Sequence, residues 1–211
     1  MMHYEILVED QSGKKALDIL VPKIISKKDT FIVHSYKGIG RIPQGLSSIT
    51  DASKRILLDR LPSLLKGYGH SFSNYDATVV VVPDLDDKDL NNFLEDLNMV
   101  LNQCNPKPNA HFCIAIEEGE AWFLGDIPAI KSAYPNAKNQ ILTSYVPDSI
   151  CGTWEKLADA IFKGGYSKLK GQGYQTVGHY KSLWAENISH HMDVDNNNSP
   201  SFCNFRDILR Q

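Results

Sequence analysis

A run of four valines at residues 79–82 is the feature that most constrains the fold of this chain. Side chains of a strand alternate between its two faces, so a run that is apolar at every position is expected to be buried on both. Such strands lie in the middle of parallel sheets that helices cover. Helical patterns precede and follow the run, at 49–65 and 88–104. The sequence therefore predicts an α/β fold with a largely parallel, Rossmann-like sheet flanked by helices.

Strands and helices alternate through the first part of the chain. Strand patterns occupy residues 4–10, 30–36, 76–84 and 110–118, and helical patterns follow the first three of them at 12–24, 49–65 and 88–104. Ser12 is placed to cap the first of these helices, and Thr50 or Asp51 lies near the start of the second. Pro62 is expected to kink or divide that second helix.

The pattern changes beyond Asp126. Prolines interrupt residues 126–142. Amphipathic helical patterns follow at 149–163, 179–192 and 201–209. The Gly-rich stretch at 164–175 is expected to be a loop. We expect an α/β core at residues 1–126 and a helical C-terminal extension at 127–211 that packs on the same domain.

Composition excludes several classes of protein. The 211 residues carry a net charge of −3, which argues against binding nucleic acid through overall charge. Apolar runs fall short of the roughly 20 residues that span a bilayer, so no membrane partner is expected. The acidic start lacks the basic segment of a signal peptide, and a cytoplasmic location is expected. The four cysteines form no CxxC pair and are expected to be reduced, some of them in the core.

Acidic side chains follow three of the predicted strands. In an open α/β sheet, ligands bind outside the carboxyl ends of the strands. If the strands are parallel neighbours, these acids converge on one edge of the sheet, and we predict a functional site there. The acids are Glu9 and Asp10 after the first strand, Asp84, Asp86, Asp87 and Asp89 after the third, and Glu117, Glu118 and Glu120 after the fourth.

Asp84 and Asp86 point the same way if the backbone between them is extended. Two carboxylates about 4 Å apart repel by roughly 4 kcal/mol at an effective dielectric constant near 20, so the pair favours a bound cation. Mg²⁺ or Mn²⁺ fits, because hard divalent ions prefer oxygen ligands. Other roles stay open: Asp87 could cap the following helix, and Asp89 would suit the positive end of its dipole. Glu9 or Asp10 taken alone could be ordinary loop acids.

The stretches "ILVEDQSGKKAL" and "PDLDD" together resemble the Toprim fold of topoisomerases, bacterial primases and OLD-family nucleases. The resemblance implies that Glu9 is the family's glutamate, which acts as general acid or base or contacts metal. It implies that Asp84 and Asp86 are the DxD pair that holds Mg²⁺. After the glutamate this chain has Asp10 and Gly13, where the family has a small residue and an acid.

A narrower resemblance extends over nearly the whole chain. "IAIEEGEAWFLGD" and "KSLWAENISHHMD", followed by "NSPSFCNF", resemble a Toprim-like bacterial family whose members are often encoded beside an ABC/SMC-type ATPase, in arrangements similar to anti-phage defence operons. This resemblance implies that Glu118 and Glu120 are further metal ligands. Asp87, which directly follows Asp86, is also a candidate metal ligand. Trp122 and Phe123 are expected to be core residues.

Basic residues are candidates for holding substrate phosphates. Residues 160–185 contain four lysines and no acid, which favours a phosphate-facing side but also fits an ordinary solvated helix face. The candidates are Lys14, Lys168, Lys170 and Lys181. Two adjacent histidines, His190 and His191, point about 100° apart on a helix and are expected to have surface or packing roles rather than to share one metal ion.

These inferences predict a metal-dependent nuclease, with Glu9, Asp84 and Asp86 as catalytic residues and Mg²⁺ or Mn²⁺ as cofactor. DNA is the expected substrate, and a defence system with a partner ATPase is the expected context. Two alternatives stay open: a non-catalytic binding or regulatory subunit of that ATPase, and a metal phosphohydrolase that acts on a nucleotide. A homodimer is also compatible with the fold.

Overall fold

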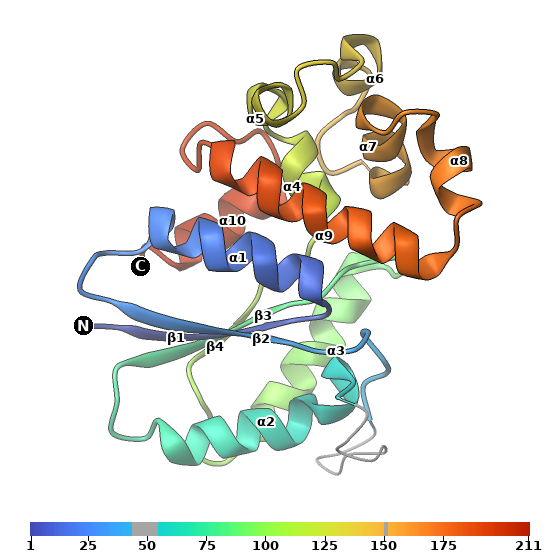
Figure 1. Ribbon diagram of the computed structural model, residues 1–211. Helices are drawn as coiled ribbons and strands as arrows, with labels where there is room; N and C mark the ends of the chain where they lie inside the picture. The colour runs from blue at the N-terminus through green and yellow to red at the C-terminus, as the bar shows by residue number, and fades with distance from the viewer. Residues whose placement is uncertain (44–54, 150–151) are drawn as a thin grey trace. The chain divides into compact units, whose positions relative to one another are not determined.

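Four parallel strands form one sheet in the computed structural model of the chain, which describes residues 1–43, 55–149 and 152–211 (Figure 1). The order across the sheet is β2-β1-β3-β4. The strands are β1 (His3–Val8), β2 (Thr30–Ser35), β3 (Ala77–Val82) and β4 (Ala110–Phe112). The predicted α/β class, with a parallel sheet, flanking helices and a helical C-terminal region, is confirmed.

The valine run forms β3, in which all six residues are buried. β1 lies between β2 and β3, and Val8 is level with Val82 of β3 and Ser35 of β2. The three strands therefore end at the same edge of the sheet. β4 is shorter than the predicted 110–118, because ladder pairing with β3 ends at Phe112.

Ten helices are described in these parts of the chain. They are α1 (Gln11–Ile24), α2 (Leu57–Ser71), α3 (Leu90–Asn102), α4 (Glu120–Leu124), α5 (Ile127–Ala133), α6 (Asn139–Thr143), α7 (Thr153–Ile161), α8 (Gly165–Lys170), α9 (Tyr174–His191) and α10 (Pro200–Ile208). The stretch 164–175, expected to be a loop, contains α8, because its lysine and leucine residues favour a helix between the flanking glycines.

Two helix boundaries differ from expectation. The side chain of Asp10, rather than Ser12, caps α1: Asp10 Oδ1 accepts the backbone N–H of Gly13 at 2.7 Å, and Ser12 Oγ donates to Asp10 Oδ2 at 2.5 Å. α2 begins at Leu57 and continues through Pro62, so the proline does not divide it. The predicted start at Thr50 or Asp51 lies outside the described residues.

Two compact units make up the described chain. The first unit consists of Met1–Lys14 with Ser26–Ile114, and the second of Lys15–Ile25 with Ala115–Gln211. The unit boundary therefore comes earlier in the chain than residue 126. The sheet, α2 and α3 form the first unit, with a core that includes Leu61, Leu65, Val79 and Leu97.

Aromatic rings dominate the core of the second unit. Trp122 stacks on Phe205 at 5.1 Å between ring centroids and meets Phe202 edge-on at 5.5 Å. Trp122 Nε1 donates to Ser201 Oγ at 2.9 Å, which satisfies the indole inside the core. Trp122 and Phe123 are both buried, which confirms their predicted core positions.

The cysteines that the structure describes are unpaired. Cys104 and Cys113 are buried, and Cys203 is partly exposed, as expected for reduced thiols. Cys151 lies outside the described residues. No helix in the described ranges is long and apolar enough to cross a bilayer.

Candidate functional site

Glu9 is the residue whose environment departs most from that of an ordinary surface carboxylate. It follows β1 directly, and its buried Oε2 has no hydrogen-bond partner among the described residues. Burial above all, together with the negative charges of Asp86 and Asp10, raises the pKa of Glu9 from 4.5 to about 7. The backbone N–H of Asp84 and the charge of Lys88 oppose this rise in pKa. Glu9 is therefore a carboxyl that can exchange a proton near neutral pH.

The position of Glu9 in the topology is that of a ligand-binding residue. Because β2 and β3 lie on opposite sides of β1, the strand order reverses between β1 and β3. Ligands of open α/β sheets bind at such a switch point, outside the carboxyl ends of the strands. Glu9 ends β1, and Asp84 comes two residues after β3. The predicted convergence of these two acids on one edge is confirmed.

Asp86 has an unusual backbone conformation. Its φ of 51° lies in the left-handed region, which asparagine and aspartate enter more readily than other non-glycine residues. The extended backbone assumed for the Asp84–Asp86 pair is therefore not present. Asp86 Oδ2 lies 2.9 Å from the ammonium group of Lys88. Lys88 was not singled out from the sequence, although its spacing of two residues from Asp86 was a visible signal.

Two other acids of the first unit have structural roles. Asp89 caps α3, where its Oδ1 accepts the backbone N–H of Asn92 at 2.9 Å. Asp87 is exposed in the turn before this helix, so the cap is Asp89 and not Asp87. Asp10 caps α1 in the same way. Of the acids predicted from the sequence in this unit, Glu9, Asp84, Asp86 and Asp87 are not helix caps, and the metal role of Asp87 stays a prediction.

The carboxylate oxygens of Glu9, Asp84 and Asp86 are ligands of the type that Mg²⁺ prefers, but they do not form a complete coordination shell. Among residues 1–43, 55–149 and 152–211, no group of three or more His, Cys, Asp or Glu side chains is arranged to hold a metal. Mg²⁺ commonly takes only one or two protein carboxylates and fills its other positions with water and substrate phosphate. Glu9 has one buried, unpaired oxygen and lies in the negative field of Asp86. A bound cation would give that oxygen a partner and would offset the repulsion between the two carboxylates.

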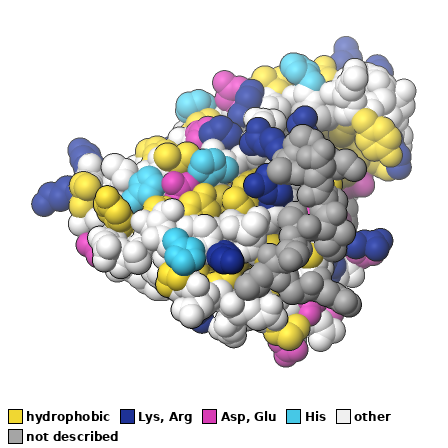
Figure 2. Space-filling model, turned by 90° about the horizontal axis from the view of Figure 1, so that it is seen from below, with side chains coloured by type: hydrophobic (Ala, Val, Ile, Leu, Met, Phe, Trp, Pro, Cys, Tyr) yellow, Lys and Arg dark blue, Asp and Glu magenta, His cyan; other side chains and the backbone are white. Residues whose placement is uncertain are grey.

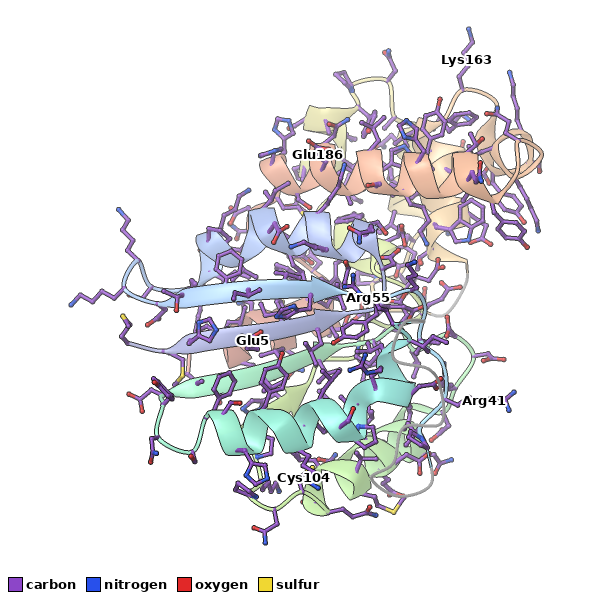
Figure 3. All side chains as sticks on the ribbon, turned by 60° about the horizontal axis from the view of Figure 1, so that its bottom comes forward. Glu5, Arg41, Arg55, Cys104, Lys163 and Glu186 are labelled. Atoms are coloured by element: carbon purple, nitrogen blue, oxygen red, sulfur yellow. The ribbon has the colours of Figure 1, made fainter. Side chains whose placement is uncertain are left out.

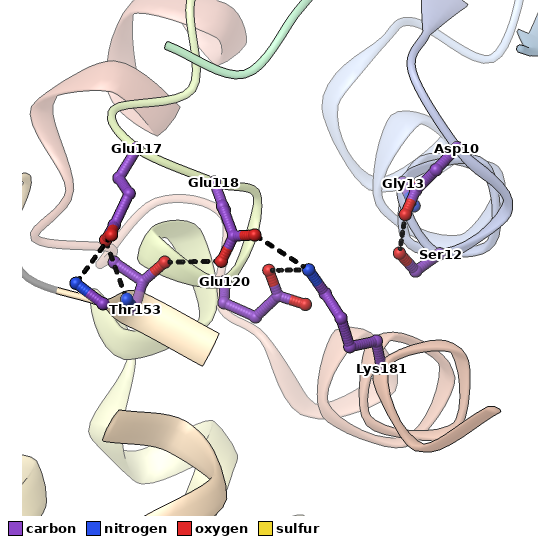
Figure 4. Close-up of polar contacts among 9 residues, drawn as sticks. Asp10, Ser12, Gly13, Glu117, Glu118, Glu120, Thr153 and Lys181 are labelled. Carbon is purple, nitrogen blue, oxygen red and sulfur yellow. Dashed lines mark hydrogen bonds and ion pairs between the residues drawn. The ribbon is translucent and has the colours of Figure 1, made fainter. Parts of the chain in front are cut away.

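Glu118 and Glu120 lie in the second unit, where a lysine joins them. Lys181 of α9 is 3.2 Å from Glu118 Oε1 and 3.3 Å from Glu120 Oε2 (Figure 4). Burial raises the pKa of Glu118; Lys181 opposes this effect, and other nearby glutamates add to it. The predicted metal role of the two glutamates stays a prediction, and within this unit their counter-ion is Lys181.

Glu117 anchors the start of α7. Its two carboxylate oxygens accept the backbone N–H groups of Gly152, at 2.6 Å, and Thr153, at 2.7 Å (Figure 4). Glu117 itself has a φ of 63°. An acid at a helix N-terminus satisfies unpaired donors and complements the helix dipole. The side chain therefore holds an unusual turn against a helix end.

The four candidate phosphate-binding lysines differ in their contacts. Lys14 Nζ donates to Val33 O on the edge strand β2 at 2.9 Å. Lys168 and Lys170 are exposed, and Lys170 Nζ lies 2.7 Å from the hydroxyl of Tyr166. A phosphate would compete with two carboxylates for Lys181. The phosphate role of all four lysines stays a prediction. His190 and His191 are exposed at the end of α9, as expected.

Comparison with known proteins places the chain in a family. No curated protein and no solved structure matches it significantly. One family model, described as "Domain of unknown function (DUF4276)", matches residues 8–210. The match extends over most of both units and includes Glu9 and every other acid discussed above. The chain therefore belongs to the DUF4276 family.

Proposed function

We propose that this chain is a metal-dependent hydrolase of phosphodiester bonds in nucleic acid, with Glu9, Asp84 and Asp86 at its active site. The observation that supports this most strongly is the buried, unpartnered Oε2 of Glu9 at the switch point of the sheet. Burying a carboxylate oxygen without a partner costs stability, so its presence at this position supports a functional role for Glu9.

The chemistry assigned to Glu9 is proton transfer. Bound Mg²⁺ or Mn²⁺ would supply charge to polarise the phosphodiester. Glu9 Oε2 would accept a proton from the attacking water, and a pKa of about 7 suits this role at neutral pH. Asp84 and Asp86 would provide oxygen ligands, while the backbone N–H of Asp84 holds the Glu9 carboxylate in place.

The resemblance to Toprim nucleases supports DNA as the substrate, and the narrower resemblance supports a partner ATPase of the ABC/SMC type in anti-phage defence. Lys168 and Lys170, both exposed, are the candidates to meet the phosphate backbone. Glu118 and Glu120 are proposed to act together with Lys181, because an ion pair joins each of the two carboxylates to the ammonium group of this lysine.

One observation favours a second candidate function. Asp86 already has a cation beside it, since Lys88 lies 2.9 Å away. A regulatory subunit could keep such a site closed by this internal ion pair and open it only on binding its ATPase. In that case the isolated chain would bind metal weakly and cleave nothing.

The test is cleavage of supercoiled plasmid by the purified chain with Mg²⁺ or Mn²⁺. The Asp84→Asn/Asp86→Asn variant should lose activity. Asp76→Asn is the matched control, because Asp76 directly precedes β3 at the opposite edge of the sheet. Nicking by wild type and Asp76→Asn alone supports the proposal. Cleavage of nucleotide phosphoesters instead of plasmid would identify a phosphohydrolase, and equal activity in all three proteins would contradict this site.

A further inference from the structure

A second group of titratable side chains lies on the sheet, around Glu5 in the middle of β1 (Figure 3). The Glu5 side chain is 12% exposed, and three donors surround its carboxylate. His34 Nε2 lies 2.5 Å from Oε2, Tyr68 Oη donates to Oε2 at 3.2 Å, and His3 Nε2 lies 3.2 Å from Oε1. All four residues belong to the first unit. The acids of the proposed active site take no part in this group.

Three of the four side chains are fully occupied by these contacts. The second ring nitrogen of His3, Nδ1, lies 2.7 Å from Thr30 Oγ1. The negative charge of Glu5 and burial both raise the pKa of Tyr68, so its hydroxyl keeps its proton and donates. His3, Tyr68 and Glu5 therefore form a fixed support.

His34 is different, because only one of its nitrogens is used. Its Nε2 is held by Glu5, and within the described ranges Nδ1 has no hydrogen-bond partner. The side chain is 39% exposed. A carboxylate that holds one imidazole nitrogen fixes the orientation of the ring and leaves the other nitrogen free to react. His34 thus presents an oriented nitrogen to solvent.

Cationic side chains lie near the two residues that follow His34. Arg55 Nη2 donates to the backbone oxygen of Ser35, the residue after His34, at 2.7 Å. The charges of Arg60 and Arg55 both lower the pKa of Tyr36, which burial raises overall. Figure 3 shows Arg55 beside the end of β2, and histidine, acidic and basic side chains lie next to one another on the surface in Figure 2. Guanidinium groups favour phosphoryl oxygens.

No serine or threonine hydroxyl is hydrogen-bonded to Glu5 or His34 among the described residues, and the hydroxyl of Tyr68 keeps its proton. The hydroxyl of Ser35 points to the other face of β2, where Gln11 Nε2 donates to it at 2.6 Å. The oriented imidazole itself is then the available nucleophile, a role that histidine has in covalent catalysis. We propose that His34 Nδ1 is a phosphoryl acceptor, supported by Glu5, for a small acyl phosphate or a comparable activated phosphoryl donor.

The step balances without an additional reactant. The lone pair of Nδ1 attacks phosphorus and forms an N–P bond, while the P–O bond to the acyl group breaks and the carboxylate leaves with the electron pair. The Nε2 proton stays on the ring and donates to Glu5, whose negative charge offsets the positive charge of the phosphorylated ring. The charges of Arg55 and Arg60, which act on the nearby Tyr36, would favour the approach of the phosphoryl oxygens.

The experiment treats the full chain with acetyl phosphate at pH 8 and measures phosphorylation over time by intact mass, with peptide mapping to locate the site. The expected result is one phosphoryl group on His34, added about tenfold faster than on the exposed His70, whose environment lacks a carboxylate partner. Phosphorus NMR should show attachment at Nδ1.

Matched variants separate this role from a structural one. His34→Gln should leave only the slow labelling of exposed histidines such as His70, and its amide can still donate to Glu5, so the fold is retained. Glu5→Gln should slow labelling of His34 about tenfold, while His70→Gln, outside this group, should leave the labelling of His34 at the wild-type rate. The Asp84→Asn/Asp86→Asn variant should also label normally, because this site does not rest on the proposed hydrolase. Equal rates of labelling at His34 and His70, or labelling of His34→Gln at the wild-type rate, would overturn the proposal.

Discussion

The ammonium group of Lys88 lies 2.9 Å from Asp86 Oδ2, at the edge of the sheet where the proposed metal site is located. The same lysine lowers the pKa of Glu9 and stands over the ring of Phe93 at 5.3 Å. A positive charge is therefore already present among the acids of the first unit. Lys88 offsets part of the repulsion that a divalent ion would offset more strongly.

Removing this lysine should strengthen metal binding. Lys88→Gln frees Asp86 and removes a competing cation, so the affinity for Mn²⁺ should rise about fivefold, the equivalent of ~1 kcal/mol for a partly exposed ion pair. Titration calorimetry measures the change. Lys107→Gln, at an exposed position of the same unit, removes the same charge elsewhere and should have no effect. Weaker binding in Lys88→Gln would show that the lysine supports the site instead.

The raised pKa of Glu9 predicts how stability depends on pH. Between pH 4.5 and about 7 the folded protein keeps a proton that the unfolded chain has lost, so the free energy of unfolding falls as the pH rises through this window. The fall attributable to Glu9 is roughly 3 kcal/mol. Glu9→Gln should remove this dependence and be more stable than wild type at pH 8, as measured by urea denaturation across the window.

Glu95→Gln provides the control for that experiment, because Glu95 is an exposed acid of α3 in the same unit. Its pH profile should follow that of wild type. Mg²⁺ should stabilise wild type at pH 8 and stabilise Glu9→Gln much less, since the ion binds the ionised carboxylate. A Glu9→Gln protein less stable than wild type at pH 8 would mean that the carboxylate has a structural partner.

Lys181 should be essential for the stability of the second unit. Its side chain is 17% exposed, and those of Glu118 and Glu120 are 21% and 4% exposed. Lys181→Met leaves the buried carboxylate of Glu120 and the partly buried one of Glu118 without this counter-ion, and should cost about 3 kcal/mol of unfolding free energy. Adding Glu120→Gln to Lys181→Met should recover part of the loss in chemical denaturation. No recovery in the double variant would show that the lysine acts through other contacts.

Glu117 should stabilise the start of α7. Glu117→Ala removes acceptors from the N–H groups of Gly152 and Thr153, and should cost about 1–2 kcal/mol. Glu117→Gln retains one carbonyl acceptor and should cost less than Glu117→Ala. Hydrogen exchange at Thr153 reports the local effect, and unchanged protection there in Glu117→Ala would contradict it.

The sequence was sufficient to predict the parallel sheet and the acids that meet at the carboxyl ends of β1 and β3. The valine run of 79–82 predicts a strand buried on both faces, and β3 is that strand. The acids after β1 and β3 then meet because neighbouring parallel strands end level. The position of an acid in the sequence does not show whether it caps a helix or takes part in chemistry. Asp10 and Asp89 are therefore identified as caps only by their hydrogen bonds to Gly13 and Asn92.

Pairs that are distant in sequence could not be predicted. Lys181 meets Glu118 across 63 positions, and His34 meets Glu5 across 29, and neither pair follows a helix or strand period. The left-handed backbone of Asp86 was also hidden, since aspartate adopts ordinary conformations far more often. These features depend on how elements pack, which a single sequence does not specify.

Calorimetric titration of Mn²⁺ at pH 8, with wild type compared against Glu9→Gln and Asp76→Asn, shows whether Glu9 contributes to a metal site. We expect a binding event in wild type and in Asp76→Asn, and in Glu9→Gln an affinity about tenfold lower or more, a loss of at least ~1.4 kcal/mol. Equal affinity in all three proteins would mean that Glu9 does not contribute to a metal site, which contradicts the proposed function.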